Sequence, residues 1–245
     1  MMFERAEQRS EELEMSYKLL DQWKNKSDEL LYSMIPQTVA DRLRAGSNPM
    51  STCESFESIT VLFCELCDFN YSTIEGVMDI VSSMNAVFSL FDSLMDKFNV
   101  YKVETVGRVY MAASGAPDRT KHHARNIADV SLQLINRVRF LKLPSGLDIQ
   151  IRIGPAVAGI VGLKVPRYCF FGDTVNTASR MQTTGIPGKI HISPDTRALL
   201  PSDLYHIEPR GTLWVKGKGN METYFLNEKQ ESRISENKNQ SSILT

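Results

Sequence analysis

Apolar residues recur at helical spacing through the first part of the chain. From Met1 to about Arg44, charged and apolar positions alternate every three or four residues, and glycine is absent. Pro36 lacks a backbone N–H, so it predicts a break between a long helix and a short one over Thr38–Leu43. Gly46 is placed to close the short helix.

The long helix repeats in heptads. Tyr17 and Leu31 occupy one seam position, and the other is occupied by Ala6, Leu13, Leu20, Ser27 and Met34. This repeat is typical of a two-stranded coiled coil, although Lys24 and Ser27 interrupt the seam. The pattern favours a helix that pairs with a second chain. The alternative is a single amphipathic helix that packs on its own domain.

From about Ser58 to Leu226, strand-like and helix-like runs alternate. The pattern predicts a hairpin turned at Gly107 and a polar, disordered tail over 228–245. Predicted strands cover 59–64, 100–104, 109–113, 149–153, 156–161, 190–192 and 223–226, and predicted helices cover 77–98, 121–141 and 174–182. The order β-α-β-β-α-β predicts an α+β fold, a ferredoxin-like sandwich with both helices on one face of an antiparallel sheet.

Composition narrows the class of protein. The 245 residues are 42% hydrophobic and 23% charged, which is typical of a soluble domain with one good-sized core. The net charge of -1 provides no global field for nucleic acid or anionic lipid. We expect no membrane span, because charge or glycine interrupts every apolar run before about 20 residues. Four cysteines without a signal-peptide pattern favour the reducing cytoplasm.

The richest candidate for chemistry is the run from Pro166 to Arg180. A predicted strand ends at Gly172, and Asn176 and Arg180 follow four residues apart on one face of the next predicted helix. An amide beside a guanidinium suits an anionic, oxygen-rich ligand. The alternative for such a pair is a solvated helix face.

This run resembles the catalytic domain of the class III nucleotidyl cyclases, of the guanylyl cyclase type. Three further segments carry the same resemblance, namely 59–63, 101–107 and 215–219. The run 30–46 resembles the linker of soluble guanylyl cyclases, whereas the helix motif and the segment around Lys216 are closer to receptor-type enzymes. The resemblance implies a cyclase sandwich over 51–227, preceded by a coiled-coil signalling helix and linker over 1–50.

The resemblance also implies a substrate and a reaction. It implies a dimer in which each site lies at the subunit interface and converts a nucleoside triphosphate into a 3′,5′-cyclic nucleotide and pyrophosphate. Glu104 and Cys169 fall at the positions that recognise the base. A carboxylate there accepts the N1 and N2 hydrogens of guanine and opposes adenine, so the implied substrate is GTP.

Further residues correspond to family positions that contact the ribose and the phosphates of the substrate. The resemblance assigns Asn176 to orienting the ribose and Arg180 to stabilising charge on the α-phosphate in the transition state. Lys216 corresponds to the lysine that neutralises the β- and γ-phosphates, with Lys218 as a close rival. Preorganised cations aimed at developing phosphoryl charge are the main protein contribution to such reactions.

The metal positions depart from the family. Its two Mg²⁺ or Mn²⁺ ions are held by two aspartates, which here correspond to Glu65 and Arg108. A guanidinium beside Glu65 favours an internal ion pair in the space that a cation needs, so Glu65 alone is a weak metal ligand. The sequence therefore predicts a heterodimer in which a partner chain supplies the metal aspartates. The alternatives are a catalytically inactive pseudocyclase that acts as a regulatory partner, and a structural coiled-coil adaptor.

Three other features of the sequence are less informative about function. Related cyclases have four more residues after Gly154, and we expect their loss to shorten a strand and its turn. Cys64 and Cys67 form a lone C-x-x-C, which is too few ligands for zinc and favours packing. His122 and His123 begin the predicted helix over 121–141 and are interpreted as surface or capping residues.

Overall fold

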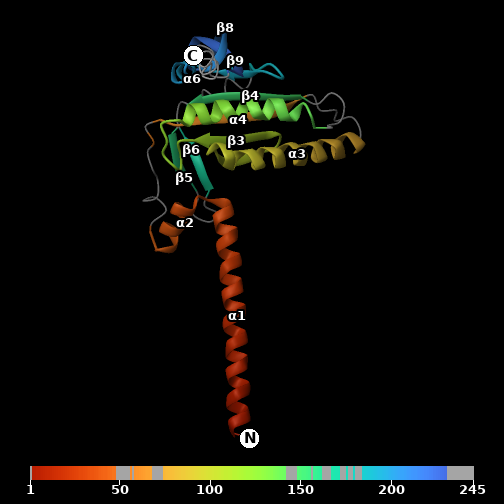
Figure 1. Cartoon of the computed structure of the whole chain (residues 1–245), viewed down its shortest axis with the longest axis vertical. Coiled ribbons are helices and arrows are strands. Elements are labelled where there is room, and N and C mark those ends of the chain that lie inside the picture. The colour runs from red at the N-terminus through yellow and green to blue at the C-terminus, as the bar shows by residue number, and fades with distance from the viewer. Residues whose placement is uncertain are drawn as a thin grey trace, which may run out of the picture. The chain divides into compact units, whose positions relative to one another are not determined.

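A computed structural model describes residues 2–47, 56, 58–67, 74–141, 148–155, 157–161, 167–171, 175, 179 and 184–230 (Figure 1). The chain divides into two units. The first comprises Met1–Glu54 with Gly159–Cys169, and the second comprises Ser55–Ala158 with Phe170–Thr245.

Two helices make up the N-terminal part of the first unit. Helix α1 spans Met2–Met34 and α2 spans Gln37–Arg44, so the predicted break at Pro36 is confirmed. Gly46 has a φ of +82° and donates its N–H to the carbonyl of Leu43 at 3.0 Å. This left-handed residue satisfies a terminal carbonyl and closes α2 as predicted.

A polar cluster joins the end of α1 to α2. The Tyr32 hydroxyl donates to Asp41 Oδ1 at 2.9 Å, and Arg44 donates to the same hydroxyl at 2.9 Å. Arg44 also lies 3.2 Å from the carboxylate of Asp28. These contacts fix the helical hairpin, although each exposed ion pair contributes little stability.

The seam of α1 is exposed. Leu13, Tyr17 and Leu20 are 52%, 68% and 68% exposed, and Met34 is 50% exposed. One continuous helix therefore carries the heptad positions in the register that the sequence predicts.

A seven-stranded sheet organises the second unit. Its strands lie in the order β2-β3-β1-β4-β7-β9-β8. The first four strands are β1 (Thr60–Cys67), β2 (Tyr101–Val106), β3 (Val109–Ser114) and β4 (Asp148–Pro155). The strand β1 pairs antiparallel with both β3 and β4, and β2 pairs antiparallel with β3. This order is that of the predicted ferredoxin-like sandwich.

Two long helices cover one face of this sheet. Helix α3 spans Ile74–Met95, with a short 3₁₀ turn at Asp96–Phe98, and α4 spans His123–Val138. Figure 1 shows α3 and α4 running side by side along the sheet. One cluster of buried side chains contains Phe91 of α3 and Leu134 of α4 together with strand residues. Both helices therefore pack on the same face.

Helix α3 is apolar enough to resemble a membrane span. By length and composition, the segment Val77–Met95 could cross a membrane, with a mean hydropathy of 1.2. Its side chains Val87, Phe91 and Leu94 are buried in the core, and the Phe91 ring meets the Tyr110 ring edge-on at 5.1 Å. Core packing accounts for these three side chains, whereas Val77, Met78 and Val81 near the start of the helix are exposed.

Three strands and a short helix extend the sheet beyond β4. They are β7 (Ile190–Ile192), α6 (Pro194–Leu199), β8 (Tyr205–Val215) and β9 (Gly219–Lys229). The sequence did not predict β8, because Pro209 and Gly211 interrupt its pattern. The register shifts next to both residues, and β8 is an edge strand, where proline is tolerated. Strand β9 runs past Asn227, so it takes in the first residues of the predicted tail, whereas 231–245 lie outside the described residues.

The strand β4 after α4 pairs with β1 along its whole length, from Thr60 opposite Pro155 to Cys67 opposite Asp148. It ends one residue after Gly154. The expected shortening relative to related cyclases stays a prediction. The next strands, β5 (Val157–Val161) and β6 (Arg167–Phe171), form a separate two-stranded sheet.

Candidate active site

The hairpin of β2 and β3 turns where the sequence predicts. Val106 pairs with Val109, which leaves Gly107 and Arg108 as a two-residue turn. Gly107 has a φ of +57°, a conformation that glycine adopts without strain. A positive φ at the first turn position is what a type II′ hairpin requires. The turn holds Arg108 at the tip of the hairpin.

Arg108 forms an ion pair with Glu65. Because β1 pairs with β3, Glu65 lies opposite Val109, next to the turn, and the Leu66 N–H donates to the Arg108 carbonyl at 3.1 Å. Arg108 Nε lies 2.8 Å from Glu65 Oε1, with side-chain exposures of 46% for Arg108 and 14% for Glu65. The ion pair that the sequence predicts is confirmed.

These donors do not fit a pair of divalent cations. The Glu65 carboxylate is held by a cation of the same chain, and Arg108 offers no lone pair to a metal. Within the described residues, no group of three or more His, Cys, Asp or Glu side chains could hold a metal ion. The described part of this chain therefore supplies an ion pair where a two-metal site needs carboxylates.

Glu104 is half-buried on β2, the edge strand of the sheet. The register between β2 and β3 shifts between Lys102 and Glu104, so that Glu104 lies opposite Met111. A bulge of this kind re-aims the side chains that follow it. Lys102 is anchored on the preceding side, with its Nζ 2.9 Å from Asp92 Oδ2.

Lys216 lies in the turn between β8 and β9. Val215 pairs with Gly219, so Lys216, Gly217 and Lys218 form the turn, and the Lys218 N–H donates to the Val215 carbonyl at 2.9 Å. Both lysines are exposed. This hairpin and the Glu104 strand lie at opposite edges of the sheet, so the structure does not place Lys216 beside Glu104 within the sheet.

The remaining predicted site residues are described incompletely or not at all. Cys169 lies on β6, and its backbone but not its side chain is described. Asn176 and Arg180 lie outside the described residues, as does most of the predicted helix around them. Their roles remain predictions.

His123 is a buried residue, and its interpretation as a surface residue was wrong. It is 4% exposed, and its ring nitrogens lie 2.7 Å from Thr60 Oγ1 and 3.0 Å from Ser58 Oγ. Burial lowers the pKa of its imidazole. His122 is exposed and occupies the N-cap position of α4, as predicted. No local pattern distinguishes the two, because the partners of His123 are distant in sequence.

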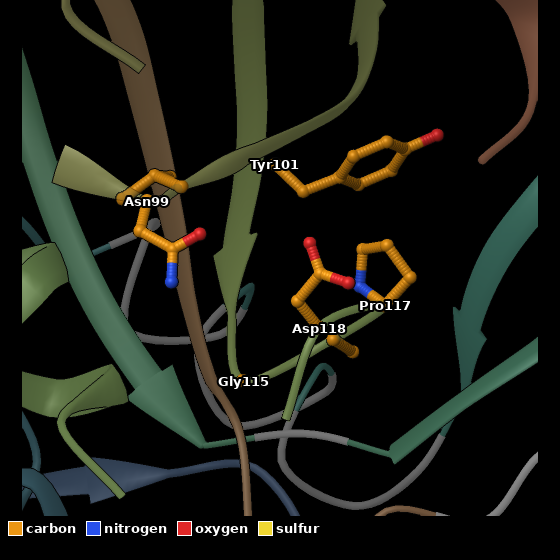
Figure 2. Close-up of a pocket in the computed structure, with 7 residues that line it drawn as sticks. Asn99, Tyr101, Gly115, Pro117 and Asp118 are labelled. Atoms are coloured by element: carbon orange, nitrogen blue, oxygen red, sulfur yellow. The ribbon is translucent and has the colours of Figure 1, made fainter. Parts of the chain in front are cut away.

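A pocket of about 240 Å³ opens at the other end of the β2–β3 hairpin. Figure 2 shows Asn99, Tyr101 and Asp118 around it. Burial raises the pKa of Tyr101 to about 12. Five residue steps along β2 separate this pocket from the turn at Arg108, roughly 17 Å at ordinary strand spacing. It is therefore separate from the Glu65–Arg108 pair.

Comparison with known proteins identifies the family. Residues 51–228 match the adenylate and guanylate cyclase catalytic domain. The chain belongs to this family. Residues 1–43 match a second family, described as heme NO binding associated. The resemblance inferred from the sequence is confirmed.

Relatives of this cyclase domain are guanylate cyclases. Soluble guanylate cyclase 89Da of Drosophila melanogaster is 48% identical over 238 residues, covering 94% of this chain and 35% of the relative. Guanylate cyclase soluble subunit beta-2 of Rattus norvegicus is 41% identical over 226 residues, covering 90% of this chain and 33% of that protein. The chain thus spans about a third of the length of the curated relatives it matches.

Solved cyclase structures share the fold. The guanylate cyclase domain of RhGC from Catenaria anguillulae, crystallised in complex with GTP, superimposes with a TM-score of 0.64 at 32% identity. The match covers 72% of this chain and 100% of that domain. Cyclases of this class are lyases that work with divalent metals, whereas the two residues that the sequence predicts at the metal positions of this chain, Glu65 and Arg108, form an ion pair.

Proposed function

We propose that this chain is a guanylate cyclase subunit that converts GTP into 3′,5′-cyclic GMP and pyrophosphate as one half of a heterodimer in the cytoplasm. The guanylate cyclase relatives and the likeness to a domain crystallised with GTP support the reaction. In this proposal the chain supplies the residues that bind the substrate, and a second cyclase subunit supplies those that bind the metal.

Guanine is the base that this subunit would select. Glu104 stands on β2 as a half-buried carboxylate, a group that accepts the N1 and N2 hydrogens of guanine. Cys169 on β6 is the second base-edge residue of the proposal, a small thiol that tolerates the guanine O6. Adenine offers an acceptor in place of the two donors, so its binding would leave the carboxylate without those hydrogen bonds.

The ribose and phosphates would be held by polar and cationic side chains. Asn176 orients the ribose, and Arg180 stabilises the charge that develops on the α-phosphate. Lys216, in the exposed turn between β8 and β9, neutralises the β- and γ-phosphates in this proposal. The neighbouring Lys218 of the same turn is the rival for this role.

The Glu65–Arg108 ion pair carries the heterodimer proposal. Both interfacial sites of a homodimer would contain this pair, so neither would offer the two carboxylates that Mg²⁺ or Mn²⁺ needs. A partner subunit with an aspartate at each of these positions would restore one complete site. That site would combine the metal ligands of the partner with the substrate-binding residues of this chain.

The decisive experiment compares the chain alone with the mixed dimer. Cyclic GMP formation is measured for the purified chain with GTP and Mn²⁺, then after mixing with a guanylate cyclase subunit that carries both metal aspartates. We expect activity in the mixture alone. A matched partner whose aspartates are replaced by asparagine should give none. Robust synthesis by the chain alone would refute the proposal.

The same ion pair favours one competing function, a pseudocyclase that regulates a partner without turnover. In that case the complete catalytic site would be formed by two copies of the partner, and this chain would change its activity from outside that site. Arg180→Ala distinguishes the two, because it should abolish the activity of the mixed dimer if this chain takes part in catalysis. In a purely regulatory subunit, the same substitution should leave the partner's activity unchanged.

A further inference from the structure

The bulge in β2 turns Glu104 to the other face of the sheet. Side chains alternate between the two faces along a strand, so Lys102 and Glu104, two positions apart, would ordinarily share one face. The register shift instead places Lys102 opposite Ala112 and Glu104 opposite Met111. Ala112 belongs to the core cluster that packs with α3 and α4, and Met111, the next residue before it, lies on the opposite face. Glu104 therefore lies on the face that these helices do not cover.

The same face carries Glu65. Its partner in the sheet is Val109, which precedes Met111 by two positions on β3, so Val109 and Met111 lie on one face. Residues directly opposite each other in an antiparallel pair share a face, which brings Glu65 and Glu104 to the same side of the sheet. A slip of β2 by one residue would move Glu104 to the helix-covered side. The bulge thus decides whether the predicted base-reading carboxylate and the predicted metal positions share a face.

Asp92 of α3 contacts the strands on both sides of this bulge. Its Oδ2 lies 2.9 Å from Lys102 Nζ, on β2 just before the bulge. Its Oδ1 accepts a hydrogen bond of 2.6 Å from the hydroxyl of Tyr110, a fully buried residue of β3. Tyr110 pairs with Thr105, the residue just after Glu104, so the two contacts flank the bulge. Lys102 Nζ also lies 5.2 Å from the centre of the Tyr110 ring. Asp92, Lys102 and Tyr110 are called here the Asp92 group.

The position of β2 in the sheet makes this support important. It is an edge strand that pairs with β3, so its register is fixed from one side of the strand. The side chains of Asp92 and Lys102 are 48% and 42% exposed, and an ion pair so exposed contributes little to global stability. The contribution of the Asp92 group is therefore local, to the register of β2.

We propose that Asp92 is a positioning residue for base selection. By holding Lys102 and Tyr110 on the two sides of the bulge, it keeps Glu104 on the face that also carries Glu65. Asp92 itself lies on α3, on the other side of the sheet, and acts without contacting the nucleotide. This inference rests on the proposed function in so far as Glu104 reads the base. Loss of the Asp92 group should change the choice between GTP and ATP more than it changes stability.

A second group of the same composition provides a matched control. Asp129 of α4 accepts a hydrogen bond of 2.7 Å from the Tyr205 hydroxyl and lies 2.6 Å from Lys229 Nζ. The Lys229 ammonium also lies 5.8 Å from the centre of the Tyr205 ring. The chemistry is that of the Asp92 group, but the strands that it joins to a helix, β8 and β9, lie at the other end of the sheet.

The first measurement is the ratio of kcat/KM for GTP to kcat/KM for ATP in the purified mixed dimer. Asp92→Ala and Lys102→Gln each remove the contact to β2, and Lys102→Gln changes an exposed side chain that the core does not need. Asp129→Ala and Lys229→Gln are the matched controls. We expect the preference for GTP to fall roughly tenfold in the first two variants, the effect of one lost hydrogen bond to the base.

Two further results follow from a positioning role. Asp92→Glu keeps a carboxylate and should retain most of the preference for GTP, and the controls should keep the wild-type ratio. A merely structural role would lower the rates with both nucleotides together and leave their ratio unchanged. An unchanged ratio in Asp92→Ala and Lys102→Gln would therefore overturn the proposal.

The second measurement needs no nucleotide and no partner. Hydrogen–deuterium exchange of the whole chain reports the backbone amides of 101–106, which pair with β3. Asp92→Ala should raise their exchange several-fold, whereas Asp129→Ala should leave it as in the wild type. Unchanged exchange would overturn the role of Asp92 in holding β2. A wild-type mixed dimer without turnover, or with equal kcat/KM for GTP and ATP, would overturn the role in base selection together with the proposed function.

Discussion

Arg108 reaches across the β1–β3 strand pair and places its Nε 2.8 Å from Glu65 Oε1. The two residues meet because the turn after β2 is short and its tip lies beside the strand that carries Glu65. A single substitution of this kind does more than remove a ligand, because the new cation also engages the carboxylate that remains. In the proposed site, the pair would oppose the binding of metal and leave the predicted nucleotide-binding residues unchanged.

Restoring the carboxylates should restore metal binding. Arg108→Asp changes the local charge by two units, and a charge contact at 4 Å is worth roughly 4 kcal/mol at the effective dielectric of a protein surface. We expect Arg108→Asp to raise the affinity for Mn²⁺ by at least about tenfold. Adding Glu65→Asp should shorten the side chain between backbone and carboxylate to the length of the aspartate found in the family. Calorimetric titration with Mn²⁺ and a non-cyclisable GTP analogue measures this. Lys97→Asp, at an exposed site, is the control for net charge. Tight binding of two metal ions by the wild-type homodimer would contradict the prediction.

Base selectivity should follow Glu104 and Cys169. The proposed site favours GTP over ATP, and Glu104→Lys combined with Cys169→Asp should reverse the preference. Each hydrogen bond lost to the wrong base costs about 1 to 3 kcal/mol when a group is left buried and unpaired. Competition binding of GTP and ATP to the mixed dimer gives the ratio. Equal affinity of the wild-type dimer for the two nucleotides would rule out the base-edge assignment.

Removal of residues 1–33 should weaken the mixed dimer. If the exposed seam of α1 pairs with the partner chain, the truncated chain should dissociate from its partner at higher concentration and lose activity in the mixture. The cyclase domain should stay folded, since its core cluster contains no α1 residue. Sedimentation velocity and circular dichroism measure the two effects. A chain that lacks 231–245 is the control. An unchanged dimer after truncation of α1 would contradict the prediction and indicate that this helix packs on its own domain.

Stability should fall below about pH 6.5 because of His123. Burial lowers the pKa of this imidazole in the folded protein, while the unfolded chain titrates near 6.5. As the pH falls through that value, the unfolded state binds a proton that the folded state resists, so unfolding becomes easier. His123→Gln should flatten this dependence in urea unfolding between pH 7.5 and 5.5. His122→Gln removes an exposed imidazole from the next position and should leave the slope as in the wild type. A wild-type slope in the His123 variant would assign the pH dependence to other groups.

Local patterns in the sequence determined much of the fold. Pro36 and Gly46 set the ends of α2, and Gly107 set the hairpin turn, because each acts through its own backbone geometry. The order of periodic segments determined the ferredoxin-like core, since connections between neighbouring elements are short. The same patterns did not predict β8, because Pro209 and Gly211 interrupt the alternation of a strand that pairs at the edge of the sheet. Strand pairing is a property of the partner as well as of the strand, so alternation alone did not reveal it.

The sequence by itself determined the family and the unusual chemistry at its metal positions. The family resemblance placed Glu65 and Arg108 at neighbouring positions, which was enough to predict opposite charges close together, although the pairing of β1 with β3 that brings them together is long-range. Tertiary structure alone decided the place of His123, whose hydrogen-bond partners Ser58 and Thr60 lie on a segment more than sixty positions away. It also set Glu104 and Lys216 at opposite edges of one sheet. Burial and long-range pairing depend on how distant segments pack, and no local pattern carries that information.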